Sequence, residues 1–337
     1  MNKPHDQMWT TYQRYKSKIE KVNELVGIRD IAKKAEVSIS TVSYALNGSP
    51  RVSEPTRQRI LAMANDMNYI PNLAGQNLRR QKTDIIAVYL SSYQGTFYGE
   101  LLEGMHQKAV ELGLELIICS GKRSRLFLPQ RLIDGILVLD MTYENEELLK
   151  YADLSFPIVV LDRKLTHEKI RSVLLDNKAG SKEAVQSLID EKIDKLCILS
   201  GPVHNHDSSE RVEAAVEVAK ANNIECEIIE GDFTEASGYL AGKDIQFESG
   251  RNYGVFALND EMALGIHNYL REKNYPIGKN IFIRGFDKNQ ISQYLMPPIK
   301  SVSYSKYNWG AMALESLQKL IKEEDVANKT VSTYFKI

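Results

Sequence analysis

The spacing of apolar side chains changes at about residue 84 of the chain. Between residues 28 and 72, apolar residues recur every three or four positions, which is typical of helices that bury one face. Ser38 and Ser53 are suitable N-caps, and Asn47-Gly48-Ser49-Pro50 is a loop signal. The pattern therefore predicts three short helices, with a tight turn between the first two, as in a helix-turn-helix domain.

From residue 84 onward, short apolar runs alternate with amphipathic segments. The runs are DIIAVYL, LELIIC, GILVLD, PIVVLD, KLCILS, ECEII, YGVFAL and NIFIRGFD. Because nearly every residue in them is apolar, they predict parallel strands covered by helices on both faces. About 250 residues is long for one open sheet, so we expect two doubly wound parallel-sheet lobes with ligands bound beyond the carboxyl ends of the strands.

Charge is unevenly distributed over the 337 residues. Residues 28–82 contain nine Lys or Arg and four Asp or Glu, whereas the whole chain has a formal net charge of −1. This excess of positive charge indicates that the helical segment meets a polyanion such as nucleic acid. No apolar run is long enough to span a membrane, and the first residues lack the apolar core of a signal peptide, which favours a cytoplasmic protein.

Signals of catalysis or metal binding are weak. There is no G-x-G-x-x-G, Walker or G-x-S-x-G motif. His204 and His206 lack further metal ligands nearby, so a polar loop is the favoured interpretation. Three widely spaced cysteines indicate buried thiols and neither a disulfide framework nor a zinc site. We therefore expect no catalytic residue, cofactor or metal. The cysteines are Cys119, Cys197 and Cys226.

The run VSISTVSYALNG, followed by VSEPTRQRIL and NYIPN, resembles the DNA-binding domain of the lactose-repressor (LacI/GalR) family. The resemblance continues after residue 27 through FYGELLEGM, DGILVL, IVVLDR, LLDNKAG, ALNDEMALG, IRGFD and PPIKSV. It implies a small all-α helix-turn-helix domain, a hinge helix, and an α/β periplasmic-binding-protein-like body of two doubly wound parallel-sheet lobes. In that family the body dimerises and binds a small effector.

The resemblance also implies domain boundaries. The DNA-binding domain would span 28–72 and the hinge helix 73–82. The N-terminal effector lobe would combine 83–176 with 304–326, and the C-terminal effector lobe 177–303 with 327–337. Residues 1–27 lie outside the family pattern and carry an apolar stripe of heptad type. This extension is either a helix that contacts the partner or DNA, or the product of an over-long gene model. The stripe consists of Met8, Tyr12, Tyr15, Ile19, Val22 and Val26.

The second helix resembles a recognition helix, whose polar face enters the major groove. Val42, Ala45 and Leu46 would face the core. Tyr44 stands where relatives often carry Arg or His, so the operator preference should differ. Glu36 stands where Gly or Asn often makes the turn, and a left-handed Glu would cost about 1 kcal/mol. The resemblance implies that Leu78 wedges into the minor groove. It assigns base and phosphate contacts to Ile39, Ser40, Thr41, Ser43, Tyr44 and Asn47.

Effector contacts are implied at the carboxyl ends of the strands. Carboxylates and amides bind vicinal hydroxyls, and aromatic rings cover the C–H face of a sugar. The motif after Arg211 usually continues with Gly and an aromatic residue, but Ala214 and Ala215 follow here. The motif positions are Asp162, Arg211, Phe233, Asn259 and Asp287, and Phe97, Tyr143 and Tyr304 could add further walls.

The segment between Cys119 and Asp134 is shorter than in relatives and strongly basic. It either brings cations to the cleft, which would indicate an anionic effector such as a sugar phosphate, or is a solvent-facing loop. Its cations are Lys122, Arg123, Arg125 and Arg131.

The sequence therefore predicts a homodimeric transcription regulator, a repressor of a carbohydrate-use operon that binds a pseudo-palindromic operator and a sugar or sugar-phosphate effector. Alternatives within the family are control by a purine or by a co-repressor protein. A sugar-binding transport protein is opposed by residues 28–82 and the missing signal peptide. A sugar-modifying enzyme is opposed by strand ends that show no catalytic constellation.

Overall fold

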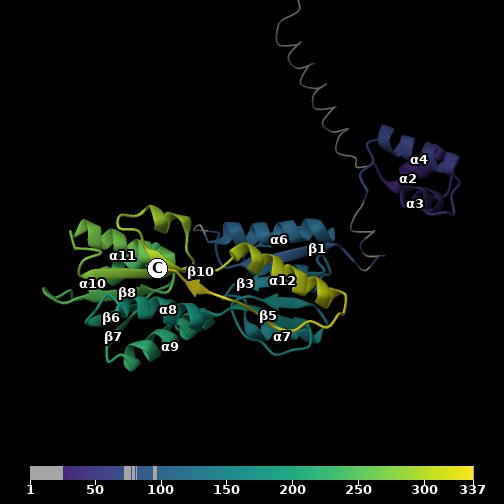
Figure 1. Ribbon diagram of the computed structural model, residues 1–337. Helices are drawn as coiled ribbons and strands as arrows, with labels where there is room; N and C mark the ends of the chain where they lie inside the picture. Colours follow the sequence, from purple (N-terminus) through teal and green to yellow (C-terminus); the bar gives the residue numbers. More distant parts are fainter. Residues whose placement is uncertain (1–25, 72–76, 78–79, 81, 94–96, 337) are drawn as a thin grey trace, which may run out of the picture. The chain divides into compact units, whose positions relative to one another are not determined.

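The computed structural model describes residues 26–71, 77, 80, 82–93 and 97–336. The chain divides into two compact units, one ending at Arg80 and one beginning at Gln81 (Figure 1). Among the described residues, the first unit contains the helices α2 (Ile28–Ala35), α3 (Ile39–Leu46) and α4 (Glu54–Asp66). The second unit is the body, in which two β-sheets are described.

The first unit is the predicted helix-turn-helix domain. Ser38 Oγ accepts a hydrogen bond from the Thr41 backbone N–H at 3.0 Å, and so begins α3. Glu36 ends α2 in the left-handed region at φ 53°, ψ 41°, as its place in the turn predicts. Ile31, Val42 and Ile60 are fully buried and hold the three helices together around one core.

The N-terminal lobe of the body contains a six-stranded sheet with the order β11-β5-β4-β3-β1-β2, and every neighbouring pair is parallel. Alternate residues of β1 enter two different clusters: Ile86 and Val88 pack on the side of α6 and α12, and Ala87 and Tyr89 on the side of α7. Both faces of the sheet are therefore covered, which explains the continuous apolar runs.

The elements of this lobe are β1 (Ile85–Leu90), α6 (Tyr98–Leu112), β2 (Glu115–Cys119), the 3₁₀ helix η1 (Lys122–Phe127), β3 (Gly135–Leu139), α7 (Asn145–Asp153), β4 (Ile158–Val160), β5 (Ile170–Leu175), α12 (Lys306–Ile321) and β11 (Lys329–Val331).

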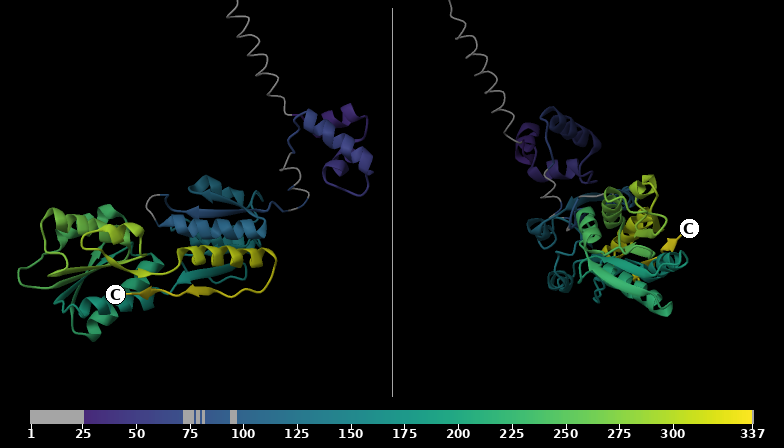
Figure 2. Two further views of the ribbon diagram at one scale, coloured as in Figure 1. Left: turned by 45° about the horizontal axis from the view of Figure 1, so that its top comes forward. Right: turned by 90° about the vertical axis from the view of Figure 1, so that its left-hand side faces the viewer.

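The C-terminal lobe repeats this architecture, a sheet with helices packed against it (Figure 2). The order of its described strands is β12-β10-β9-β8-β6-β7, in which only the β10–β12 pair is antiparallel. The two predicted doubly wound lobes are confirmed. The elements are α8 (Asn177–Ile189), β6 (Lys195–Ser200), α9 (His206–Ala221), β7 (Glu225–Glu230), α10 (Glu235–Asp244), β8 (Tyr253–Ala257), α11 (Asp260–Glu272), β9 (Ile281–Phe286), η2 (Gln290–Tyr294), β10 (Lys300–Ser303) and β12 (Tyr334–Phe335).

The chain passes between the lobes three times, after β5, after β10 and after β11. The assignment of all of 327–337 to the C-terminal lobe is wrong, because β11 pairs with β5 in the N-terminal lobe, with Thr330 beside Leu174. A three-residue edge strand carries no periodic signal that identifies its sheet. The third crossing therefore lies between Val331 and Tyr334.

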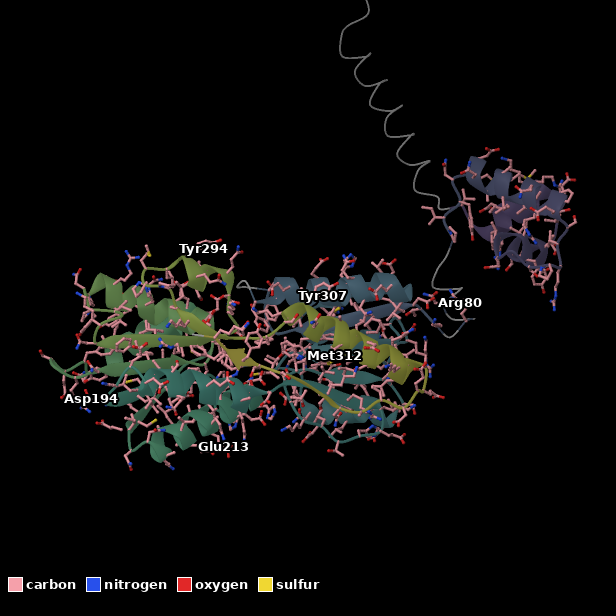
Figure 3. The ribbon with its side chains drawn as sticks, in the orientation of Figure 1. Arg80, Asp194, Glu213, Tyr294, Tyr307 and Met312 are labelled. Atoms are coloured by element: carbon pink, nitrogen blue, oxygen red, sulfur yellow. The ribbon has the colours of Figure 1, made fainter. Side chains whose placement is uncertain are left out.

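Glycines allow two helix pairs to approach closely, one pair in each lobe. A Cβ atom on Gly104 of α6 would lie 2.0 Å from the carbonyl oxygen of Tyr307 on α12, where Figure 3 labels Tyr307. A Cβ atom on Gly265 of α11 would lie 2.0 Å from the carbonyl oxygen of Glu235 on α10. Side chains larger than hydrogen would push these helices apart. Among the described residues, no helix has the length and apolarity that a membrane span requires.

Candidate functional site

The predicted recognition residues lie on α3 or at its C-cap. Val42 and Ala45 are buried, whereas the Ile39 side chain is 47% exposed. Ser40 and Asn47 are also exposed, and Thr41, Ser43 and Tyr44 are half-buried. The helix thus presents hydroxyl and amide groups on the side that does not pack against the domain core. Leu78 and most of the predicted hinge helix lie outside the described residues.

Two side chains on this face have one hydrogen-bonding group already occupied. Asn47 Nδ2 donates to the Ser43 carbonyl oxygen at 2.6 Å, so its side-chain oxygen is left to accept. Arg51 Nη1 donates to the Tyr44 hydroxyl oxygen at 2.8 Å, and the guanidinium carbon is 5.2 Å from the Tyr44 ring centroid. The Tyr44 hydroxyl therefore keeps its own proton for an acceptor on a ligand.

In the body, Asp287 and Tyr304 meet where β9 and β10 end. The Tyr304 hydroxyl donates to Asp287 Oδ1 at 2.7 Å, and Lys306 Nζ donates to the Asp287 backbone carbonyl. Asp287 has φ 98°, a backbone conformation that costs a non-glycine residue energy. Burial, together with the nearby Asp287 carboxylate, raises the pKa of Tyr304 well above its usual value, so Tyr304 stays a neutral donor.

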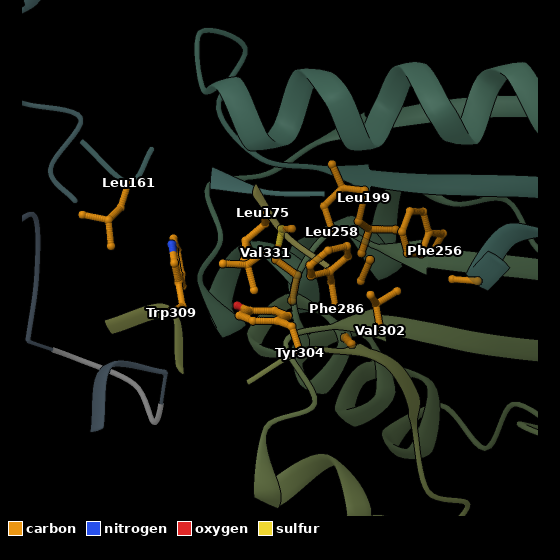
Figure 4. Packing of buried hydrophobic residues seen from close by; sticks show 14 of the residues in the cluster. Leu161, Leu175, Leu199, Phe256, Leu258, Phe286, Val302, Tyr304, Trp309 and Val331 are labelled. Carbon is orange, nitrogen blue, oxygen red and sulfur yellow. The ribbon is translucent and has the colours of Figure 1, made fainter. Parts of the chain in front are cut away.

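Arg211 on α9 lies next to this pair. Its guanidinium carbon is 3.6 Å from the Phe286 ring centroid. The ring centroids of Phe286 and Tyr304 are 6.0 Å apart, and Figure 4 labels these two residues. Arg211 Nε donates to Asn177 Oδ1 at 2.8 Å and Nη1 donates to the Leu258 carbonyl at 2.6 Å. These bonds fix the guanidinium plane and leave Nη2, which is 4.0 Å from Asp207 Oδ2, able to bind a ligand.

Burial raises the pKa of the Asp207 carboxyl group, and the Arg211 cation opposes that shift. Asp207 Oδ1 also accepts a hydrogen bond from Asn177 Nδ2 at 2.8 Å. Asp207, Asn177 and Arg211 therefore form one buried polar network beside Tyr304, whose pKa both charged groups influence.

Asn259 and Phe233 are joined to each other. Asn259 Nδ2 donates to the Phe233 carbonyl at 2.8 Å, and its Oδ1 caps α11 by accepting from the Met262 N–H at 3.0 Å. The Phe233 ring packs on Gly201, where a Cβ atom would lie 2.2 Å from a ring carbon. Both residues therefore shape the loops at the strand ends.

The other predicted wall residues have different surroundings. Asp162 accepts from Arg163 Nε at 2.7 Å and Nη2 at 3.0 Å, so both carboxylate oxygens are occupied. Tyr143 is fully buried in the N-terminal lobe. Phe97 lies edge-on to Trp309 with ring centroids 6.3 Å apart, and Lys306 Nζ is 5.9 Å from the Phe97 centroid. Phe97 thus joins the group around Lys306.

In the basic segment between Cys119 and Asp134, Arg125 is paired with a carboxylate. Arg125 is 3% exposed and donates to Glu147 at 3.2 Å and to the Thr142 carbonyl at 2.8 Å. Its guanidinium carbon is 4.3 Å from the Tyr143 ring centroid. For Arg125 the hypothesis of a cation supplied to the cleft is wrong, because the side chain turns into its own lobe, where a carboxylate neutralises it.

Other features of the body lie apart from these residues. A groove runs along α9 and β7 over Val212, Val216 and Ile228, and none of the predicted effector residues lines it. Ala214 and Ala215 are buried in α9. His206 Nε2 is 3.6 Å from Glu210. Within the described parts of the chain, no three His, Cys, Asp or Glu side chains are grouped so that they could hold a metal ion.

Comparison with known proteins gives two family matches. Residues 27–72 match the family described as bacterial regulatory proteins, lacI family, and residues 185–335 match the periplasmic binding protein-like domain. A protein of Vibrio atlanticus (strain LGP32) named HTH-type transcriptional repressor PurR is 30% identical over 311 residues, which cover 88% of this chain and 92% of that one. The chain belongs to the lacI family. It is a DNA-binding transcription regulator.

Other lacI-family regulators match most of the chain. Catabolite control protein A of Priestia megaterium is 28% identical over 319 residues, covering 91% of this chain and 96% of that protein. The structure of a sugar-binding transcriptional regulator from Enterococcus faecalis has a TM-score of 0.73 and 42% identity, and covers 77% of this chain and 97% of that one. These findings give no support to the transport-protein alternative, because residues 27–72 match the lacI family of regulatory proteins and the relatives that cover about nine tenths of the chain are named as regulators.

Sequence reasoning missed several residues of this lacI-family body. Asn177 and Asp207 hold Arg211, and Lys306 and Trp309 lie against Tyr304. Lys306 could have been found, because it follows the predicted wall residue Tyr304 by only two positions. Asn177 and Asp207 begin two different helices, and nothing in the one-dimensional pattern indicates that they meet.

Proposed function

We propose that this protein is a cytoplasmic homodimeric repressor that binds a pseudo-palindromic operator and releases or tightens on it when a small hydroxylated effector, a sugar or sugar phosphate, enters the body. One observation carries the proposal. The same chain joins a polar, exposed recognition helix to a two-lobed body in which buried carboxylate, hydroxyl and guanidinium groups meet at the crossing between the lobes.

On the DNA side, α3 lies in the major groove of each half-site. Ser40, Tyr44 and Asn47 reach base edges, and Ile39 meets a thymine methyl group. Thr41 and Ser43 contact phosphates, and Leu78 wedges into the minor groove at the centre of the operator. The names of several relatives support this role: besides PurR, a relative in Haemophilus influenzae is a ribose operon repressor. One structure with this fold is a lac repressor dimer bound to operator.

On the effector side, Asp287 and Arg211 bind hydroxyl groups, and Tyr304 orients the Asp287 carboxylate. Phe97 and Phe233 cover apolar faces of the ligand. Asn259 shapes the site from the C-terminal lobe, and Asp162 lines it from the N-terminal lobe. A ligand that binds both lobes favours their closed arrangement, so effector affinity and operator affinity are coupled reciprocally. The ligand is bound and is not converted. A transcriptional regulator named CelR, solved in complex with cellobiose, has the same fold.

The test begins with selection of operators from random duplexes by the purified full-length protein. We expect a site with dyad symmetry, because two identical recognition helices read it. Tyr44→Phe should weaken binding by about 1–3 kcal/mol and relax preference at one base pair per half-site, because phenylalanine lacks the hydroxyl group that donates the hydrogen bond. A selected site without symmetry would contradict the homodimeric mode.

The complex of the protein with its selected operator is then used to identify the effector. Neutral sugars, sugar phosphates and nucleobases are added, and operator release and thermal stability are measured. A true effector at about one hundred times its Kd stabilises the protein by about 2.7 kcal/mol. A response to nucleobases alone would favour the purine alternative. A response only to an added phosphocarrier or other protein would favour the co-repressor alternative.

A further inference from the structure

Lys306 carries a buried positive charge at the second crossing between the lobes. The residue is 4% exposed. Lysine is rarely buried unless a negative group compensates it, since transfer of an ammonium ion out of water is very costly. The surroundings of Nζ therefore decide what Lys306 is for.

The buried cations of the described residues differ in their partners. Arg125 has Glu147 at 3.2 Å, Arg284 has Glu191 at 3.0 Å, and Arg211 has Asp207 at 4.0 Å. In this described part of the chain, no carboxylate oxygen lies within 4.0 Å of Lys306 Nζ. The segment 94–96, which precedes Phe97, contains no acidic residue either.

Neutral groups surround the ammonium instead. Nζ donates to the Asp287 backbone carbonyl, and it lies 5.6 Å from the Tyr304 ring centroid and 5.9 Å from the Phe97 ring centroid. The side-chain carboxylate of the same residue, Asp287, accepts the Tyr304 hydroxyl on Oδ1. Aromatic faces attract a cation, but they do not neutralise it.

The position in the helix is also unfavourable for a cation. Lys306 is the first residue of α12, a helix of 16 residues whose N-cap is Ser305. The backbone amides at a helix N-terminus carry partial positive charge and favour an anion there. A negative group placed beside Lys306 would interact favourably with both the ammonium and the helix.

We infer that the effector carries an anionic substituent, a phosphate or a carboxylate, that binds Lys306 at the N-terminus of α12 while its hydroxyl groups bind Asp287 and Arg211. This inference rests on the proposed effector site and names the chemical class of its ligand. It replaces the basic segment around Arg125 with Lys306 as the residue that recognises the anion.

The experiment compares matched probes on the full-length protein. Each probe is titrated at constant ionic strength, and the midpoint of thermal unfolding is measured. The probes are glucose with glucose 6-phosphate and gluconate, ribose with ribose 5-phosphate, and inorganic phosphate. We expect at least one anionic probe to bind about tenfold or more tightly than its neutral counterpart. Glucose 6-phosphate against gluconate distinguishes a phosphate from a carboxylate.

Two variants test the residue. Lys306→Met removes the charge, and Lys306→Gln removes it while keeping an N–H donor for the Asp287 carbonyl. Both should lose the preference for the anionic probe and keep operator binding, which shows that they fold. Lys322→Met is the matched control, because Lys322 is exposed at the other end of α12. The control should keep the preference unchanged.

Three results would overturn the inference: neutral probes that bind as tightly as their anionic counterparts, no stabilisation by any anionic probe beyond that by sodium chloride, or an unchanged anion preference in both Lys306 variants. Operator binding by the unmodified protein is measured in parallel. Its absence would contradict the proposed function, whereas tight binding of a neutral sugar would contradict only the anionic class of effector.

Discussion

His267 shows how one buried side chain sets a response to pH. The ring is fully buried in α11, and neither nitrogen has a hydrogen-bond partner among the described residues. Burial lowers its pKa below the ordinary 6.5, the Arg271 cation lowers it further, and the backbone at Met296 and Pro297 opposes the shift less strongly. The folded protein therefore holds this imidazole neutral.

This lowered pKa predicts a loss of stability in acid. Below about pH 6.5 the unfolded chain takes up a proton that the folded chain does not, so the free energy of unfolding falls until the pH reaches the folded pKa. Above that window His267 contributes no pH dependence. His267→Met should flatten the dependence of the unfolding free energy, measured by denaturant titration, between about pH 7.5 and pH 5.

His106 provides the control for this measurement, because it is exposed on α6. His106→Met should leave the slope of unfolding free energy against pH as it is in the unmodified chain. An unchanged slope in His267→Met would show that other groups cause the acid sensitivity.

Individual site residues were predictable where a motif and a strand end coincide. Asp287 follows the apolar run of β9 and Tyr304 follows β10, and the structure brings the two into a hydrogen bond. The burial of Arg125 was not predictable, because a sequence shows the charge of a loop residue but not the direction of its side chain. Its carboxylate partner Glu147 lies 22 positions away on α7.

At the scale of elements, α6 and α12 can pack closely because Gly104 has no Cβ atom at their contact. The Cβ of Gly104→Ala would lie 2.0 Å from the Tyr307 carbonyl oxygen unless the helices separate. We expect the variant to destabilise the body by about 1–3 kcal/mol, the range for overpacked cores, measured by denaturant unfolding.

Gly99→Ala lies in the same helix with nothing within 4 Å of the added Cβ atom. This control should be neutral or slightly stabilising, because alanine has the higher helix propensity. Equal effects of the two substitutions would show that helix propensity, rather than close packing, determines the result.

Elements with a long periodic pattern were predictable, and short ones were not. The strands β1 and β6 are continuous apolar runs, and their identity and parallel pairing follow from burial on both faces. β11 has three residues and an exposed Thr330, so its sequence fits an edge strand of either lobe. Only its pairing with β5 assigns it to the N-terminal lobe.

For the whole molecule, an ion pair between the lobes belongs to the same network as Arg211. Lys164, which follows β4 in the N-terminal lobe, lies 3.0 Å from Glu210 on α9 of the C-terminal lobe. Glu210 also accepts a hydrogen bond from Asn177 Nδ2 at 3.3 Å, and Asn177 accepts one from Arg211. These contacts connect the N-terminal lobe to the proposed effector residue Arg211.

Lys164→Ala should weaken effector binding only modestly. The Lys164 side chain is 68% exposed, and ion pairs of that kind contribute about 0.2–1 kcal/mol. We expect up to a fivefold change, roughly, in effector affinity at low salt and a smaller one at high salt, measured by titration. A loss much larger than this would indicate that Lys164 contacts the ligand itself. Lys178→Ala is a control, since its partner Glu213 lies in the same lobe.

The three crossings between the lobes also determine which motions the body can make. A single tether would allow one lobe to swivel, tumble or slide relative to the other. Here the segments of the first and third crossings are hydrogen-bonded to each other. The Asp176 N–H donates to the Val331 carbonyl at 2.9 Å, and the Thr333 hydroxyl donates to the Asp176 carbonyl at 2.6 Å. The Trp309 indole beyond the second crossing donates to the Val173 carbonyl at 2.7 Å. Because the crossing segments are bonded to one another, they oppose torsion and shear between the lobes. The motion that a ligand can drive is then rotation about a single hinge axis.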